Sequence, residues 1–120
     1  FIMDVVQNRP IEVRGDGSPI RSYMYISDLV IWLLKIFLHG RSMYPYNVGS
    51  DQPISIAELA HEIASVGNSP HAVRILKAVK PGGSINRYIP DINRASSELG
   101  LALLTPLPEA IRRTLSYYSL

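Results

Sequence analysis

The chain has 120 residues, of which 47% are hydrophobic and 18% are charged, and this composition excludes an intrinsically disordered protein. The absence of cysteine excludes a disulfide framework and any thiolate metal site. The net charge is +2, and the basic residues are scattered along the chain. Because they form no basic stripe or tail, the sequence does not indicate nucleic-acid binding. The longest apolar run, 29–38, is too short to cross a membrane, and we expect no membrane association.

The N-terminal third of the chain predicts a helix followed by two short strands. Residues 1–8 have the apolar spacing of an amphipathic helix, which Pro10 would end. A short strand is expected at 11–13. The sequence Gly-Asp-Gly at 15–17 predicts a tight turn, because such residues adopt the positive φ angles that turns need. A second strand, rich in Tyr and Ile, is expected over 20–26.

The next expected element is an unusually apolar helix. Ser27 or Asp28 could cap its N-terminus, and the helix would run to His39 and stop at Gly40. The segment 29–38 within it is apolar nearly all round. A helix of this kind is either buried or covered by another body.

The middle of the chain carries the clearest local signal. A short strand is expected at 46–49. Ser55 and Glu58 then fit a capping box, in which each side chain accepts a hydrogen bond from the other residue's backbone N–H. The helix that begins there is expected to continue through Ser65 and close near Gly67.

The last third of the chain predicts further short elements. We expect a strand at 73–76, a loop at 80–84, an extended segment at 87–89, a helix at 92–99 and a last helix at 108–118. Asp91 could cap the first of these two helices and Gly100 could end it, while Pro108 suits the first turn of the other. The chain is therefore predicted to be a small α/β domain with about four helices and several short strands.

Familiar catalytic signatures are missing from the sequence. We find no Gly-x-Gly-x-x-Gly, no phosphate-binding loop ending in Gly-Lys-Ser/Thr, no Gly-x-Ser-x-Gly and no Tyr-x-x-x-Lys. His39, His61 and His71 lack the convergent partners of a catalytic or metal site, so we interpret them as surface or helix-end residues.

Three basic residues stand out, although each also has a structural explanation. Arg21 lies on a strand that is otherwise apolar, where it could be an edge-strand residue in solvent. Lys80 precedes Pro-Gly-Gly and could place an ammonium group beside an anion, or belong to an ordinary turn. Arg87 follows the same loop. Arginine is the better bidentate binder of phosphate. Taken one at a time, each of the three residues is nevertheless better explained by a structural role.

Read together and in order, these segments resemble a known family. The segments are Ile-Glu-Val-Arg-Gly-Asp-Gly at 11–17, Ile-Arg-Ser-Tyr-Met-Tyr-Ile-Ser-Asp-Leu-Val at 20–30, Tyr-Asn-Val-Gly at 46–49, Ser-Ile-Ala-Glu-Leu-Ala at 55–60, Lys-Pro-Gly at 80–82, Arg-Tyr at 87–88, Glu-Leu-Gly-Leu at 98–101 and Pro-Glu-Ala-Ile at 108–111. Together they resemble the C-terminal part of extended short-chain dehydrogenases of the NAD-dependent epimerase/dehydratase family. Nucleotide-sugar 4,6-dehydratases and 4-epimerases are the most similar types.

The resemblance implies substrate-binding roles for five residues. Arg21 would contact the diphosphate of a nucleotide sugar, and Val13 and Arg14 would border the nucleobase. Lys80 stands where the family usually has a second phosphate-binding arginine, and Arg87 would compensate for the missing guanidinium.

Other positions are implied to be structural or to depart from the family pattern. Asn47 would fix nearby backbone through its side chain, and Asp28 would be a structural and helix-capping residue. Gly83 and Ser84 occupy positions where a histidine and an acidic residue are common in the family.

The resemblance also implies that the NAD-binding loop and the catalytic Tyr and Lys precede this segment in the family order. We therefore expect 1–120 to be the nucleotide-sugar-binding C-terminal domain of a longer enzyme, without the Rossmann domain and not catalytic alone. NAD would be the cofactor and a nucleotide-diphosphate sugar the partner of the parent enzyme, which would be a cytoplasmic homodimer, and the isolated segment would self-associate. The alternative is a non-enzymatic protein-interaction module that uses the apolar helix 29–38.

Overall fold

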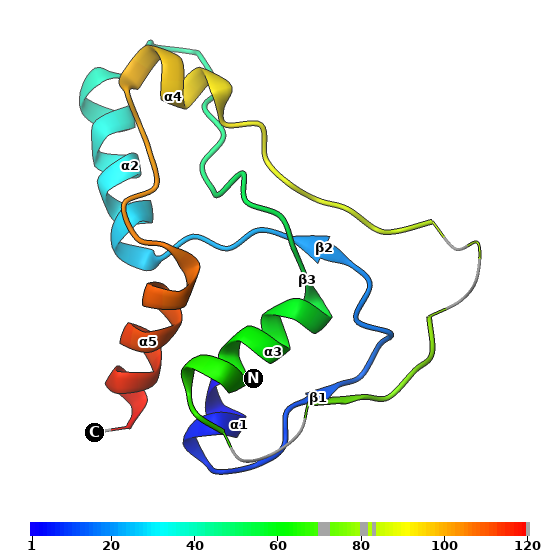
Figure 1. Ribbon diagram of the computed structural model, residues 1–120. Coiled ribbons are helices and arrows are strands. Elements are labelled where there is room, and N and C mark those ends of the chain that lie inside the picture. Colours follow the sequence, from blue (N-terminus) through cyan, green and yellow to red (C-terminus); the bar gives the residue numbers. More distant parts are fainter. Residues whose placement is uncertain (70–72, 80–81, 83, 120) are drawn as a thin grey trace.

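The computed structural model describes residues 1–69, 73–79, 82 and 84–119. In chain order its elements are α1 (Ile2–Val6), β1 (Glu12–Val13), β2 (Ile20–Arg21), α2 (Ile26–His39), β3 (Ile54–Ser55), α3 (Ile56–Val66), β4 (Arg74–Ile75), α4 (Asn93–Leu99) and α5 (Leu107–Tyr118) (Figure 1). The predicted mixed α/β class is confirmed. The described part of the chain has five helices, where about four were expected.

The strands form two separate two-stranded sheets within the described residues. β1 pairs with β4 in parallel, and β2 pairs with β3 in antiparallel orientation. An isolated parallel bridge between Ile20 and Arg87 adds the extended segment 84–88 to the second sheet. This bridge brings the segment beside Arg21, although more than sixty positions separate them in the sequence.

Two strand predictions are corrected by the structure. The strand expected over 20–26 ends at Arg21, because pairing with β3 stops there. The segment 46–49, expected to be a strand, is not one. It is fixed by side-chain contacts instead: Asn47 donates from Nδ2 to the carbonyl oxygen of Asp91 at 2.9 Å. A Cβ on Gly49 would lie only 2.8 Å from Pro90, so the two segments pack closely.

The apolar helix is present as α2, but its start differs from the prediction. The helix begins at Ile26 with Tyr25 at the N-cap position and without a side-chain cap hydrogen bond. The expectation that Ser27 or Asp28 caps this helix is therefore wrong. Both residues lie inside the first turn, and the Asp28 carboxylate is engaged with a distant segment described below.

The expectation that Asp91 caps α4 is also wrong, because Ile92 is the N-cap residue and no side-chain cap hydrogen bond is present. Three other local signals agree with the structure. The capping box at the start of α3 is complete, with Glu58 N–H donating to Ser55 Oγ at 3.1 Å and Ser55 N–H donating to Glu58 at 2.8 Å. Helix α4 ends at Gly100, which has a left-handed conformation with φ of 60°. Helix α5 carries Pro108 in its first turn, as predicted.

The buried side chains form two clusters. The first joins β1, α3 and α5, and consists of Ile11, Val13, Leu59, Ala60, Ile63, Ile111 and Leu115. The second joins α2 to α4 and the residues after it, and consists of Trp32, Ala95, Leu99 and Leu101. The described residues therefore form two small hydrophobic cores, where a domain is usually built around a single core.

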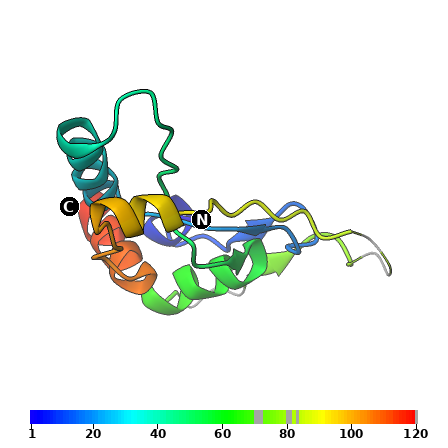
Figure 2. The same ribbon diagram turned by 90° about the horizontal axis from the view of Figure 1, so that it is seen from above.

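The chain is broad and thin. Its principal extents are 47 × 44 × 17 Å, and Figure 2 shows the view turned by 90° from Figure 1. Its radius of gyration is 16.7 Å, whereas a compact domain of this length would have about 13.6 Å. None of the described helices is long and apolar enough to cross a membrane.

Candidate functional site

Arg21 lies at the end of β2 with part of its guanidinium already engaged. Its Nη1 donates to the backbone carbonyl of Ile20 at 2.7 Å and to that of Asn86 at 3.0 Å. Within the described residues, Nε and Nη2 have no partner. Two carbonyls thus fix the position of the group, while its other edge keeps donors for a ligand.

Arg87 is brought next to Arg21 by the backbone of the 84–88 segment. Ile20 N–H donates to the Asn86 carbonyl at 2.9 Å, and Tyr88 N–H donates to the Ile20 carbonyl at 3.1 Å. The side chain of Arg87 is exposed. The two arginines therefore lie on neighbouring extended segments, and the residue paired with Arg87 is Ile20, directly before Arg21.

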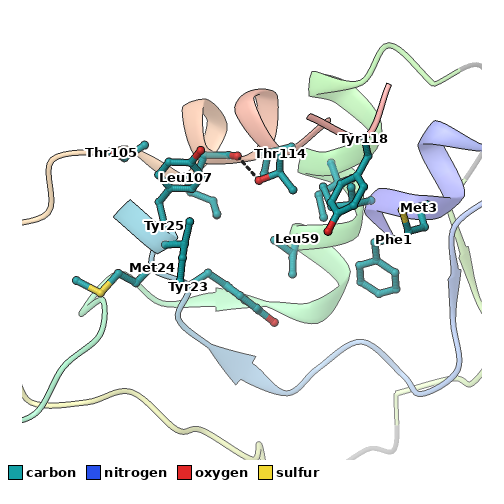
Figure 3. Close-up of a pocket in the computed structure, with 15 residues that line it drawn as sticks. Phe1, Met3, Tyr23, Met24, Tyr25, Leu59, Thr105, Leu107, Thr114 and Tyr118 are labelled. Atoms are coloured by element: carbon teal, nitrogen blue, oxygen red, sulfur yellow. Dashed lines mark hydrogen bonds between the residues drawn. The ribbon is translucent and has the colours of Figure 1, made fainter. Parts of the chain in front are cut away.

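Tyr23 is a neighbour of Arg21 that the sequence reasoning did not select. Its ring lines an open apolar hollow together with Phe1, Leu59 and Tyr118, and Figure 3 shows these side chains. Burial raises the pKa of Tyr23, while the positive charge of Arg21 acts in the opposite direction. The signal that could have identified it is the two-residue spacing from Arg21, which puts side chains on the same side of an extended segment.

Val13 and Arg14 lie in very different surroundings. Val13 is only 2% exposed and belongs to the first core cluster, and its carbonyl accepts from the Leu76 N–H at 3.0 Å. Its side chain is therefore occupied by packing. Arg14 is exposed and lines a polar depression with Arg9 and Glu12.

Several predicted residues lie elsewhere. Lys80, Gly83 and His71 are outside the described residues. Ser84 is described and exposed. Asn47 is bound to the backbone of Asp91, next to α4 and away from β2.

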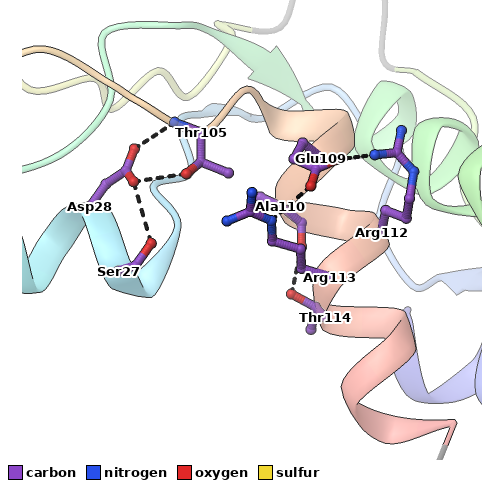
Figure 4. Close-up of polar contacts among 8 residues, drawn as sticks. All are labelled: Ser27, Asp28, Thr105, Glu109, Ala110, Arg112, Arg113 and Thr114. Carbon is purple, nitrogen blue, oxygen red and sulfur yellow. Dashed lines mark hydrogen bonds and ion pairs between the residues drawn. The ribbon is translucent and has the colours of Figure 1, made fainter.

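Asp28 is the most highly connected buried polar residue among those described. It is 1% exposed, and its Oδ2 accepts from the backbone N–H groups of Leu104 at 2.8 Å and Thr105 at 2.9 Å. Its Oδ1 accepts from the Thr105 hydroxyl at 2.8 Å and from Ser27 at 3.4 Å. Figure 4 shows the contacts of Asp28 with Ser27 and Thr105. Burial alone would raise the pKa of Asp28, but the hydrogen bonds from Thr105 and Leu104 outweigh it and lower the pKa.

The comparison with curated proteins finds relatives among nucleotide-sugar enzymes. No family model matches the sequence. The chain is 31% identical over 119 residues to UDP-glucuronic acid decarboxylase 1 of Danio rerio, covering 99% of this chain and 28% of that protein. It is 27% identical over 124 residues to dTDP-glucose 4,6-dehydratase of Salmonella typhimurium, covering 98% of this chain and 34% of that protein. The resemblance to NAD-dependent epimerases and dehydratases is confirmed.

Solved structures of this family share the fold of the chain. The UDP-glucose 4-epimerase of Thermotoga maritima, solved with UDP-glucose, has a TM-score of 0.83 at 20% identity, covering 98% of this chain and 37% of the epimerase. WbmF of Bordetella bronchiseptica, in complex with NAD+ and UDP, has a TM-score of 0.82 at 21% identity over 97% of this chain and 33% of that chain. The chain thus spans about a third of the length of these proteins, and it is a partial segment of the extended short-chain dehydrogenase fold.

The chemistry that the candidate residues Arg21 and Arg87 offer is binding and orientation of a ligand. The sequence contains no glycine-rich loop and no Tyr-x-x-x-Lys, so its own residues do not fit a site for NAD. In the part of the chain that the structure describes, no group of three or more His, Asp and Glu side chains could hold a metal ion. The guanidinium groups of Arg21 and Arg87 offer several N–H donors and no acceptor, which suits them to hold an anion.

Proposed function

We propose that the chain is the substrate-binding portion of an NAD-dependent nucleotide-sugar epimerase or dehydratase. In this role it grips the nucleotide diphosphate and places the sugar, and it is not catalytic by itself. The observation that carries the proposal is the Arg21 guanidinium, which is fixed by two backbone carbonyls and keeps free donors on its other edge among the described residues. Forked donors of this kind bind phosphate oxygens in a bidentate manner.

The relatives support a nucleotide sugar as the ligand class. The curated relatives are a UDP-glucuronic acid decarboxylase and a dTDP-glucose 4,6-dehydratase, and the Thermotoga structure contains UDP-glucose. Arg87 pairs with Ile20, the residue before Arg21, and would supply a second guanidinium. Arg14 would border the nucleobase, and any contact from Val13 would come from its backbone, since its side chain is buried. The role of Lys80 at the phosphate stays a prediction.

The complete enzyme would use NAD as its cofactor. The binding site for NAD would lie in the part of the fold that this chain does not contain. The redox chemistry at the sugar would take place there, and these residues would contribute orientation. Assembly of the parent as a homodimer and a cytoplasmic location also stay predictions from the sequence.

The proposal can be tested with the chain itself. We would titrate isotopically labelled protein with UDP-glucose and, separately, dTDP-glucose, and follow backbone amide shifts by NMR. The largest shifts are expected at Arg21, Tyr23 and Asn86–Tyr88. Arg21→Ala should weaken binding by about 10- to 150-fold, the range expected for loss of hydrogen bonds to a charged group.

Two further variants make the test specific. Arg112→Ala removes an exposed arginine on α5 and should leave the affinity unchanged. Arg87→Ala should weaken binding if Arg87 compensates for the missing second arginine, and unchanged affinity would exclude that role. Equal affinities of the Arg21→Ala variant and the unaltered chain would show that Arg21 is not the phosphate ligand.

The alternative, a non-enzymatic interaction module using 29–38, has less support. The relatives that match nearly the whole chain are enzymes. The exposed apolar residues of α2 do not require a separate function, because they also suit a face that packs against the rest of an enzyme.

A further inference from the structure

A second group of basic residues lies outside the candidate site, around the ring of Tyr44. The guanidinium carbon of Arg41, in the turn after α2, is 4.3 Å from the ring centre, and that of Arg94, on α4, is 5.2 Å from it. The two guanidinium carbons are therefore at most 9.5 Å apart, which is the sum of these distances. Guanidinium groups stack favourably on aromatic rings. We call Arg41, Tyr44 and Arg94 the arginine–tyrosine cluster.

Backbone groups hold the cluster where the turn after α2 meets α4. Tyr44 N–H donates to the carbonyl oxygen of Arg41 at 3.2 Å, which closes the turn that carries both residues. Arg94 Nη1 donates to the carbonyl oxygen of Pro45 at 2.8 Å, which attaches α4 to the end of this turn. Among the described residues, the other guanidinium nitrogens of Arg94 and all of those of Arg41 have no hydrogen-bond partner. Both arginines are exposed, so these donors are open to a ligand.

The two charges of the cluster have no acidic partner within the described residues. The arginines that form an ion pair with a carboxylate are Arg9, Arg74, Arg112 and Arg113. Those placed in the proposed nucleotide-sugar site are Arg14, Arg21 and Arg87. Glu98 is four residues after Arg94, but it accepts from the Tyr46 hydroxyl at 2.7 Å, and no ion pair joins it to Arg94 in the described part of the chain. Two like charges less than about 10 Å apart are only partly screened by salt, so an anion between them would relieve their repulsion.

We propose that the arginine–tyrosine cluster binds a phosphate group, at a site separate from that of Arg21. A phosphate group carries about −1.5 to −2 charges at neutral pH and offers several acceptor oxygens. Two charge-assisted hydrogen bonds to one phosphate span about 8 Å between guanidinium carbons, which the separation of at most 9.5 Å allows. A carboxylate has one charge and two oxygens, which a single guanidinium already satisfies. Figure 1 places α4 and the end of α2 away from β2, so the inference does not depend on nucleotide-sugar binding.

The test is a titration of the isotopically labelled chain with sodium phosphate and, separately, with methyl phosphate. Sodium chloride keeps the ionic strength constant, and sodium acetate replaces phosphate in a parallel titration. The Cζ and Nε signals of the arginine side chains are followed by carbon-detected NMR. Arg113 is the matched control, because it also lies over a tyrosine, 5.7 Å from the centre of the Tyr25 ring, but its Nε is paired with Glu109 at 2.7 Å.

We expect the signals of Arg41 and Arg94 to shift with a single dissociation constant for phosphate, while those of Arg113 stay unchanged. Arg41→Gln and Arg94→Gln should each weaken binding at the remaining arginine by about tenfold or more, the loss typical of a hydrogen bond to a charged group. Arg113→Gln should leave the affinity unchanged. Equal affinities for phosphate and methyl phosphate would mean that the site accepts free and esterified phosphate alike, whereas tighter binding of one would identify the source.

Three results would overturn the proposal. The first is an absence of shifts at Arg41 and Arg94, and the second is shifts with acetate that equal those with phosphate. The third is an unchanged phosphate affinity in both glutamine variants, which would show that the two arginines do not share a ligand. Repeating the titration with Arg21→Ala should give the same dissociation constant at the cluster. Because no nucleotide sugar is present, failure here is separate from failure of the proposed substrate-binding role.

Discussion

Asp28 and Thr105 are joined by two hydrogen bonds across a separation of 77 residues. The carboxylate accepts from the Thr105 backbone N–H at 2.9 Å and from its hydroxyl at 2.8 Å. Asp28 belongs to α2, on the side of the second core cluster, whereas Thr105 leads directly into α5, which packs in the first. The pair therefore connects the two cores.

Removing this carboxylate should be costly. Asp28→Ala removes the buried acceptor of the N–H groups of Leu104 and Thr105 and of the Thr105 hydroxyl, and we expect the free energy of unfolding to fall by about 3 kcal/mol. The measurement is urea denaturation followed by circular dichroism. Asp51→Ala is the control, because Asp51 is exposed and, among the described residues, accepts only from Gln52, and it should change stability by less than about 0.5 kcal/mol. Similar stabilities of the two variants would contradict the connecting role of Asp28.

The same variant should separate the unfolding of the two cores. Trp32 is the only tryptophan and is buried in the second cluster, so its fluorescence reports that cluster alone. Far-ultraviolet circular dichroism reports all helices, including α3 and α5 of the first cluster. In Asp28→Ala the two probes should show different urea midpoints, since coincident transitions require one cooperative unit. Coincident curves in the variant would mean that other contacts couple the cores.

The hydrogen bonds to Asp28 also predict a pH dependence. They lower its pKa below the unfolded value of about 3.9. A carboxyl with a lowered folded pKa contributes stability that is fully present above the unfolded pKa and is lost as the pH falls through the folded pKa. The stability difference between the unaltered chain and Asp28→Asn should thus be largest near neutral pH and shrink below about pH 4.

This comparison isolates Asp28 from the other acidic residues. The pKa of Asp16 is lowered by hydrogen bonds from Ser18, and that of Glu58 by hydrogen bonds from Ser55, but both groups are present in the two proteins. The measurement is urea denaturation at a series of pH values. A difference that stays constant from neutral pH to acid would show that ionisation of Asp28 does not matter.

Local signals in the sequence predicted the fold where the interacting residues are close together in the chain. The Ser55–Glu58 capping box and the end of α4 at Gly100 involve residues within one helical turn. The N-terminus of α2 was predicted wrongly because Asp28 hydrogen-bonds to Thr105, which no local pattern reveals. The strand expected at 46–49 was predicted wrongly for a similar reason, since Asn47 in this segment hydrogen-bonds to the distant Asp91.

The candidate site shows the same limit. The pattern of the sequence selected Arg21, and the resemblance gave it a role, but neither revealed the carbonyl of Asn86 that fixes the guanidinium. Tyr23 could have been found from its spacing to Arg21. Burial of the Val13 side chain could not have been predicted from spacing, because it depends on the packing of α3 and α5 over β1.

Gly17 offers a test of how tightly the turn after β1 packs on α3. Its φ is 73°, and an added Cβ would lie 2.7 Å from the Cβ of Ala57. Gly100 has a φ of 60° with nothing within 4 Å of an added Cβ, so it is a matched control. Both Gly→Ala changes should cost about 1–2 kcal/mol for the left-handed backbone. Gly17→Ala should cost a further 1–3 kcal/mol, roughly, because the new methyl overpacks the contact.

The measurement is urea denaturation of both variants beside the unaltered chain. Ala57→Gly provides a rescue, because it removes the methyl group that an added Cβ on Gly17 would meet. In the Gly17→Ala/Ala57→Gly double variant most of the extra cost should disappear, because only the 3.3 Å contacts with the backbone of residue 57 remain. The backbone cost and about 1 kcal/mol for glycine in a helix are left. If Gly17→Ala proved no more destabilising than Gly100→Ala, the turn would have to be free to move away from α3. Its position beside the N-terminus of that helix would then not be fixed by close packing.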